Sequence, residues 1–149
     1  MRCDAQRISS RSIGGAEMKT MADIGAQLPS LVVGPISTEI ITQFSRAQRD
    51  FNPIHVSTAA AQAAGFSGPI VHGMFIFGQF ERLVRTWEAM DIVSLQGRFL
   101  RPVSVGAVLV LSGRVLQKAG DVLSLRLLAK EEGGSLVAIG EAKLRITSP

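Results

Sequence analysis

Two residues suited to proton transfer lie five positions apart in the segment Asp50-Phe51-Asn52-Pro53-Ile54-His55. Pro53 fixes its own φ angle and disfavours helical geometry at Asn52, so we expect a turn that the Asn52 side chain closes. Such a turn brings Asp50 and His55 to the mouth of one pocket. A carboxylate and an imidazole held together can activate one water, because one group accepts its proton while the other relays a proton. The turn therefore makes Asp50 and His55 candidates for an acid–base pair.

A glycine lies near the start of a helix predicted from Ile70 to Met90, for which Pro69 suits the first position. Glycine costs a helix about 1 kcal/mol relative to alanine, which indicates that something approaches the backbone at Gly73. First-turn amides have no partner within the helix and lie at its positive end, so they would stabilise a ligand carbonyl oxygen that gains negative charge. Close packing of the helix on a sheet is the other interpretation of Gly73.

The second histidine, His72, precedes this glycine and is flanked by apolar residues. We expect a hydrogen-bonded structural histidine that supports the site rather than a second catalyst. The two histidines and Asp50 do not show the sequence spacing of a zinc or iron site, and acid–base catalysis needs no metal. The sequence therefore predicts no metal.

The elements that must position these residues are a short first strand, three helices and then four strands. The flanking helices are one that Ser37 or Thr38 caps and that ends near Gln48, and one that Ser57 caps over 58–64, before Gly65. The first half of the central helix, Ile70 to Phe80, is apolar on nearly every side and must be wrapped by other elements. The predicted strands are 31–36, 92–99, 107–117, 122–131 and 136–146, with hairpin turns at 118–121 and 132–135.

The composition limits the function classes. A chain of 149 residues, 46% hydrophobic and 19% charged, fits one globular domain. Its formal charge of +4 is modest and shows no block of like charges, so a nucleic-acid tail is not indicated. No apolar run reaches the length of a membrane span. The single cysteine, Cys3, fits a reducing compartment, and we expect a cytoplasmic protein.

Residues 1–28 mix both signs of charge with a Gly14-Gly15 pair and no apolar period, so we expect a disordered N-terminal extension before a domain over 29–149. Its charges are not followed by the apolar core of a secretory signal. An organelle transit peptide and a start codon assigned too early, before Met18 or Met21, are the alternatives.

The pattern D-x-N-P-I-H, an alanine-rich helix and then G-F-x-x-P-I-x-H-G-M resembles the hydratase motif of the MaoC-like (R)-specific enoyl-CoA hydratases and dehydratases. The resemblance is strongest over Asp50 to Met74 and extends in element order from Pro29 to Ile146. It implies an α+β hot-dog domain, in which an antiparallel sheet wraps around a long central helix. It also implies that Asp50 and His55 are catalytic and that the Gly73 amide binds the thioester oxygen.

The resemblance further implies a homodimer formed by joining two sheets, or a heteromer with another hot-dog chain. The expected partner is an acyl-CoA thioester, whose coenzyme A is part of the substrate, so no separate cofactor is expected. Gln48-Arg49 departs from the family, which usually has small residues before the aspartate. A cation there would weaken Asp50 as a base or, pointing outward, bind a phosphate or carboxylate. Arginine is more often a solvent-exposed surface residue than a ligand-binding one, and this is the other interpretation of Arg49.

The resulting hypothesis is reversible hydration of a trans-2-enoyl thioester to the (R)-3-hydroxyacyl product. Two alternatives stay open: a catalytically silent or accessory subunit of a heteromeric hydratase, and a hot-dog thioesterase. Met74, Phe75 and Phe77 are expected in the core or along the acyl pocket. The aromatic side chains that would shorten that pocket are Phe75, Phe77, Phe80 and Trp87.

Overall fold

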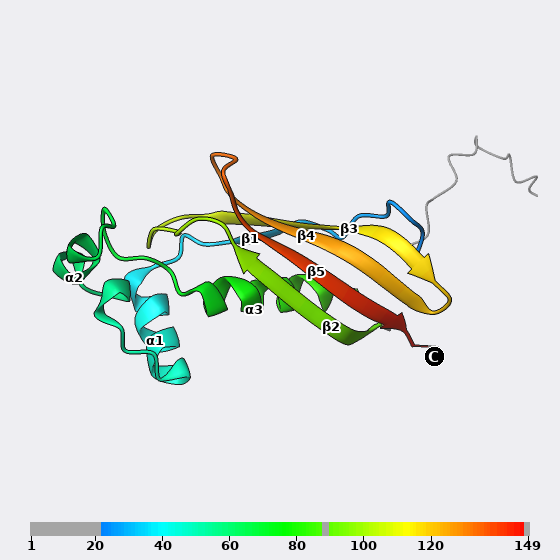
Figure 1. The fold of residues 1–149 in the computed structure, drawn as a ribbon, viewed down its shortest axis with the longest axis horizontal. Helices are drawn as coiled ribbons and strands as arrows, with labels where there is room; N and C mark the ends of the chain where they lie inside the picture. Colours follow the sequence, from blue (N-terminus) through cyan, green and yellow to red (C-terminus); the bar gives the residue numbers. More distant parts are fainter. Residues whose placement is uncertain (1–21, 88–89, 148–149) are drawn as a thin grey trace, which may run out of the picture.

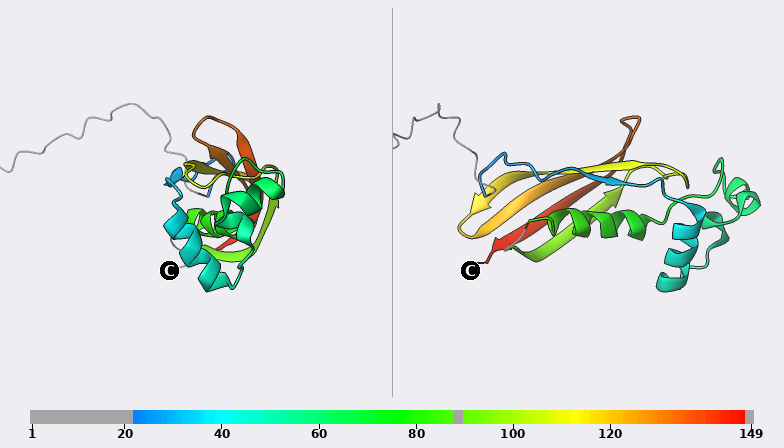
Figure 2. Two further views of the ribbon diagram at one scale, coloured as in Figure 1. Left: turned by 90° about the vertical axis from the view of Figure 1, so that its left-hand side faces the viewer. Right: turned by 180° about the vertical axis from the view of Figure 1, so that it is seen from behind.

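A computed structural model describes residues 22–87 and 90–147 of the chain. Five antiparallel strands form one sheet in the order β1-β3-β4-β5-β2. The strands are β1 (Leu31–Val33), β2 (Met90–Phe99), β3 (Leu109–Ala119), β4 (Val122–Glu131) and β5 (Leu136–Ile146). Their hairpins lie where the glycine-containing turns predict them. The sheet curls around one helix, α3 (Gly73–Val84), which lies along its concave face (Figures 1 and 2). This is the α+β arrangement that the hot-dog resemblance implied.

Helix α3 is shorter at both ends than the predicted Ile70–Met90 helix. At its start, Ile70 forms a bridge to Ser104, and the Val71 amide donates to the Val103 carbonyl at 2.8 Å. Pro69 therefore precedes an extended segment, and its prediction as the first helical residue is wrong. At the other end, strand β2 already begins at Met90.

The apolar face of α3 supplies the centre of the core. Ile76, Phe80, Leu83 and Val84 are at most 3% exposed and belong to one cluster with inward side chains of β3, β4 and β5. Alternation along β4, where Leu123, Leu125, Leu127 and Ala129 are buried, directs one face of the sheet at the helix. The wrapping expected for an apolar central helix is therefore confirmed.

Two smaller helices, α1 (Thr38–Gln48) and α2 (Thr58–Ala63), lie together at one end of the sheet, beside the N-terminus of α3 (Figure 1). Ser37 caps α1 by accepting from the Ile40 amide at 3.2 Å, and Ser57 caps α2 by accepting from the Ala60 amide at 3.2 Å. Gly65 follows α2 with φ +92°, as expected of a C′ residue. The segment between α1 and α2 carries the predicted catalytic pair.

Part of the predicted N-terminal extension is ordered. Gln27 forms a bridge to Arg114, and the Leu28 amide donates to the Gly113 carbonyl at 3.0 Å. The Ala26 and Leu28 side chains are buried in the core. The folded domain therefore begins before the predicted boundary at Pro29, whereas residues 1–21 lie outside the described part of the chain. Within the described residues, no helix has the length and hydropathy to cross a membrane.

Candidate active site

Asp50 follows the C-terminus of α1, where the chain turns sharply. Its backbone amide donates to the Ser45 carbonyl at 3.0 Å, and Arg49 caps the helix in the left-handed region with φ 54°. The Asn52 amide donates to Asp50 Oδ1 at 3.2 Å. One carboxylate oxygen is thereby held by the backbone, and Oδ2 is left to face the histidines.

His55 ends one 3₁₀ turn, η1 (Pro53–His55), so the segment has local helical geometry where an open turn was expected. Asn52 closes it as predicted, since its Oδ1 accepts from the Ile54 amide at 3.2 Å. His55 Nδ1 donates to the Ile70 carbonyl at 2.7 Å. Because a carbonyl only accepts, this bond assigns the proton to Nδ1, and Nε2 of the neutral ring is a free acceptor.

His72 is the N-cap residue of α3 and is 3% exposed. Its Nε2 lies 3.1 Å from Ser45 Oγ, whereas Nδ1 is buried without a hydrogen-bond partner. A bare acceptor costs less to bury than a bare N–H, so we assign the proton to Nε2, which donates to Ser45. The hydrogen bond expected of His72 is therefore present, and its supporting role stays a prediction.

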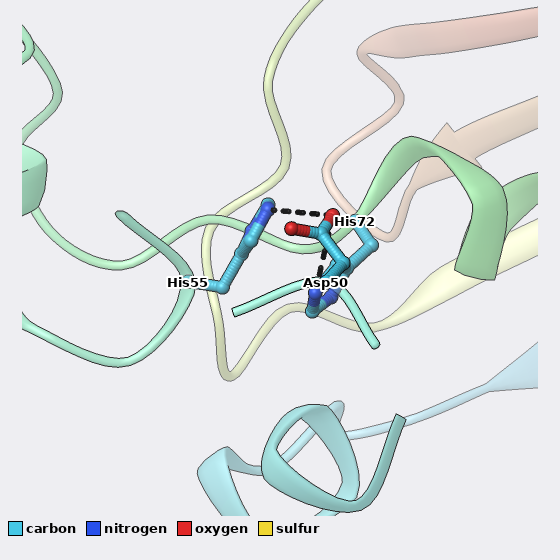
Figure 3. Close-up of side chains that lie close together, drawn as sticks. All are labelled: Asp50, His55 and His72. Atoms are coloured by element: carbon cyan, nitrogen blue, oxygen red, sulfur yellow. Dashed lines mark ion pairs between the residues drawn. The ribbon is translucent and has the colours of Figure 1, made fainter. Parts of the chain in front are cut away.

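The Asp50 carboxylate faces both imidazole rings (Figure 3). Its Oδ2 lies 3.7 Å from His55 Nε2 and 3.8 Å from His72 Nε2. These separations exceed hydrogen-bond length, so Asp50 and His55 do not share a proton directly. Two acceptors at this spacing suit a water that donates one hydrogen to Asp50 Oδ2 and the other to His55 Nε2.

The exposed fractions of the three side chains differ sharply. That of Asp50 is 47%, against 9% for His55 and 3% for His72. Burial lowers the pKa of His72 most, and the neighbouring His55 lowers it further, whereas Asp50 raises it. His72 is therefore a neutral ring at neutral pH. The His55 ring stacks on it.

A pocket of about 480 Å³ opens at this cluster and reaches the start of α3. Asp50, His55, His72 and Gly73 line it together with Phe44, Gln48, Met74 and Phe99. As the first residue of α3, Gly73 has an amide with no acceptor inside the helix. The predicted pair and the predicted glycine therefore meet at one pocket. Met74 is 57% exposed, so it belongs to the pocket mouth and not to the core.

The close approach expected at Gly73 exists, and the group that approaches is the ring of Phe99. A Cβ atom on Gly73 would lie 2.9 Å from Cε2 of that ring. Packing therefore explains why this position is glycine, as the second interpretation stated, and Gly73 still lines the pocket.

Three side chains could hold a metal by geometry. One ligand atom each from Asp50, His55 and His72 lie within 4.8 Å of one another. Their sequence spacing hid this proximity, because the turn after α1 and the start of α3 meet only in the fold. The prediction of no metal rested on spacing and stays a prediction.

Two residues of the site escaped sequence reasoning. No local signal identifies Ser45, although it lies five residues before Asp50 and its Oγ is 3.1 Å from His72 Nε2. Phe99 ends a strand far along the chain, and nothing local places it over Gly73. Phe80 and Trp87, expected as pocket-shortening aromatics, are 0% and 2% exposed within the core.

Comparisons with known proteins identify the family to which the chain is similar. The family model described as "MaoC like domain" matches residues 21–122. The mitochondrial 3-hydroxyacyl-[acyl-carrier-protein] dehydratase of Arabidopsis thaliana is 31% identical over 64% of the chain. The chain spans just over half (57%) of that relative's length. The (R)-specific enoyl-CoA hydratase of Aeromonas caviae is 28% identical over 71% of the chain and 83% of its own length.

Solved structures support the fold. An (R)-hydratase from A. caviae, described as involved in PHA biosynthesis, aligns with a TM-score of 0.78 and 24% identity over 85% of this chain and 98% of the other. The ChsH1–ChsH2 complex of Mycobacterium tuberculosis aligns with a TM-score of 0.77 and 23% identity, over 85% of this chain and 99% of the other. Similar folds therefore occur in complexes of two different chains.

Proposed function

The chain belongs to the MaoC-like domain family, and on that premise we propose that it catalyses the reversible hydration of trans-2-enoyl thioesters to (R)-3-hydroxyacyl thioesters. The observation that carries this proposal is the 3.7 Å separation of Asp50 Oδ2 and His55 Nε2 at the pocket that Gly73 also lines. Two fixed acceptors and a free helix amide are the groups that addition of water to a conjugated thioester requires.

In the proposed reaction, a water bound to Asp50 and His55 attacks C3 of the enoyl group. One of its protons passes to the pair as the C3–O bond forms. The electrons of the C2=C3 bond move toward the carbonyl, which becomes enolate-like, and the Gly73 amide stabilises its oxygen. The protonated pair then returns the proton to C2, so that one water is consumed and the site is restored.

His72 has a supporting role in this scheme. Its ring stacks on His55, and Ser45 holds its Nε2. Asn52 likewise holds Oδ1 of Asp50 through its backbone amide. Preorganised partners of this kind keep the reacting groups at the same spacing before and during the reaction.

The acyl carrier is coenzyme A or acyl carrier protein. The names of the two relatives include both carriers, and the reaction at C2 and C3 is the same. We propose that coenzyme A belongs to the substrate and that no other cofactor takes part. Location in the cytoplasm stays a prediction.

The proposed assembly is a homodimer joined along β2. This strand is ten residues long, forms one edge of the sheet, and exposes 47% of Val93. A long edge strand with apolar side chains is a surface that proteins usually cover. A heteromer with a second hot-dog chain is the alternative. Size-exclusion chromatography with light scattering of the purified chain distinguishes a homodimer from a monomer.

The loss of enoyl absorbance on addition of crotonyl-CoA tests the function. The parent protein should remove the absorbance quickly, and the folded Asp50→Asn variant should not, because an amide cannot accept the proton. Near-normal turnover by that variant would remove Asp50 from the mechanism. Free thiol released from acyl-CoA would instead indicate a thioesterase. No activity alone, together with co-purification of another hot-dog chain, would indicate an accessory subunit.

A further inference from the structure

Phe99 separates two hollows on the surface of the domain. One is the catalytic pocket, which contains Asp50 and His55. The other, the apolar groove, has a volume of about 360 Å³ and is lined mainly by Phe66, Ile70, Val71, Ile76, Leu100 and Val103. Gly73 and Phe99 line both hollows. The Phe99 ring, packed on Gly73, is thus the partition between them.

The contact between Phe99 and Gly73 is tight. A methyl group on Gly73 would lie 2.9 Å from Cε2 and 3.0 Å from Cζ of the ring. Carbon atoms do not pack at such distances, so the ring occupies all the space above this glycine. An acyl chain that passes from the catalytic pocket over Gly73 must therefore displace the Phe99 ring.

The floor of the apolar groove is buried and held by backbone bonds. Val71 donates to the Val103 carbonyl at 2.8 Å, and their side chains are 4% and 1% exposed. Ile76, from the second turn of α3, is 3% exposed. Phe99 and Leu100 form an accessible rim, at 46% and 44% exposed. Such a surface suits an unbranched alkyl chain, which has no polar group to satisfy.

We propose that Phe99 determines the acyl chain length that this protein accepts, an inference that rests on the proposed function. With the ring in place, the catalytic pocket ends at Gly73 and holds a short acyl chain. The apolar groove begins beside the same glycine, where the thioester carbonyl is placed. A smaller side chain at position 99 joins the two hollows, and the distal methylenes of a longer acyl chain then lie in the groove.

The test is the chain-length profile of kcat/KM with trans-2-enoyl-CoA substrates of four, six, eight and ten carbons. The kcat/KM of the parent protein should decline for substrates longer than six carbons. Each methylene moved from water into the groove contributes about a four-fold gain in binding. The ratio of ten-carbon to four-carbon kcat/KM should therefore rise on the order of ten-fold or more in Phe99→Ala. Leu116→Ala, an exposed truncation on β3 that lines neither hollow, is the control and should keep the parent ratio.

A second substitution tests the groove itself. Leu100→Trp in the Phe99→Ala background fills the groove and should return the ratio toward that of the parent. Circular dichroism checks folding. If Phe99→Ala does not fold, the ratio of ten-carbon to four-carbon kcat/KM is measured on Phe99→Leu instead. A folded position-99 variant that hydrates crotonyl-CoA with the parent ratio would overturn the inference, as would a parent that already prefers ten carbons. A parent that hydrates no substrate of the series would overturn the proposed function instead.

Discussion

The imidazole rings of His55 and His72 are stacked, with centroids 3.6 Å apart and planes inclined by 20°. Their nearness disfavours two positive charges, and this is one reason why the pKa of His72 is lowered, after burial itself. A neutral His72 leaves the proton relay to His55. The two stacked rings therefore have different roles. His72 is a fixed, uncharged support, and His55 presents its Nε2 to the pocket.

The lowered pKa of His72 predicts an acid-dependent loss of stability. The unfolded histidine titrates near 6.5, and the folded one below it, so the unfolded state binds more protons between the two values. The free energy of unfolding should therefore fall as the pH decreases below about 6.5. A His72→Gln variant loses this contribution. Urea unfolding at pH 7.5 and 5.5 checks this, and equal pH dependence of parent and variant would contradict it.

Arg49 carries a backbone cost that glycine would remove. Its φ of 54° lies in the left-handed region, where a side chain costs about 1 kcal/mol relative to glycine. Arg49→Gly should raise the free energy of unfolding by about 0.5–1 kcal/mol, measured in urea. Arg49→Ala keeps the backbone cost and removes the charge, so it should not stabilise. Equal stabilisation by both variants would assign the effect to charge.

Chelation should leave hydration unchanged, since the proposed mechanism needs only Asp50, His55 and a water. Added Zn²⁺ should inhibit. Zinc at bond lengths of about 2.1 Å requires tetrahedral ligands roughly 3.4 Å apart, close to the 3.7 and 3.8 Å observed from Asp50 Oδ2. Binding to His72 Nε2 would displace the proton that this atom donates to Ser45. Calorimetry should show weaker zinc binding to His72→Gln. Activity lost to a chelator and restored by a metal would instead make the metal a cofactor.

Local signals predicted the parts of the fold that depend on neighbours in sequence. The caps Ser37 and Ser57 and the glycine-containing hairpin turns act within a few residues, and they were correct. The helix start predicted at Pro69 was wrong, because the pairing of Val71 with Val103 overrode the local helix signal. The same cause hid Phe99 at Gly73, since a strand end and a helix start meet only once the sheet has curled.

The two glycines of α3 offer a matched test of the Phe99 contact. A methyl group on Gly78 meets nothing within 4 Å, so Gly78→Ala should stabilise the domain by about 0.5–1 kcal/mol through helix propensity. Gly73→Ala gains less propensity, because Gly73 is the first helical residue, and its methyl group would lie 2.9 Å from the Phe99 ring. It should therefore destabilise the domain by about 1 kcal/mol, the low end for overpacking, because the half-exposed Phe99 ring can shift.

Phe99→Leu distinguishes this clash from other effects of Gly73→Ala. The smaller side chain leaves room for the methyl group, so the double variant should recover most of the stability lost by Gly73→Ala. Urea unfolding of the parent, both single variants and the double variant gives the coupling energy. If the losses simply add, Phe99 does not press on Gly73 in solution. The glycine must then be explained by approach of the substrate to its amide alone.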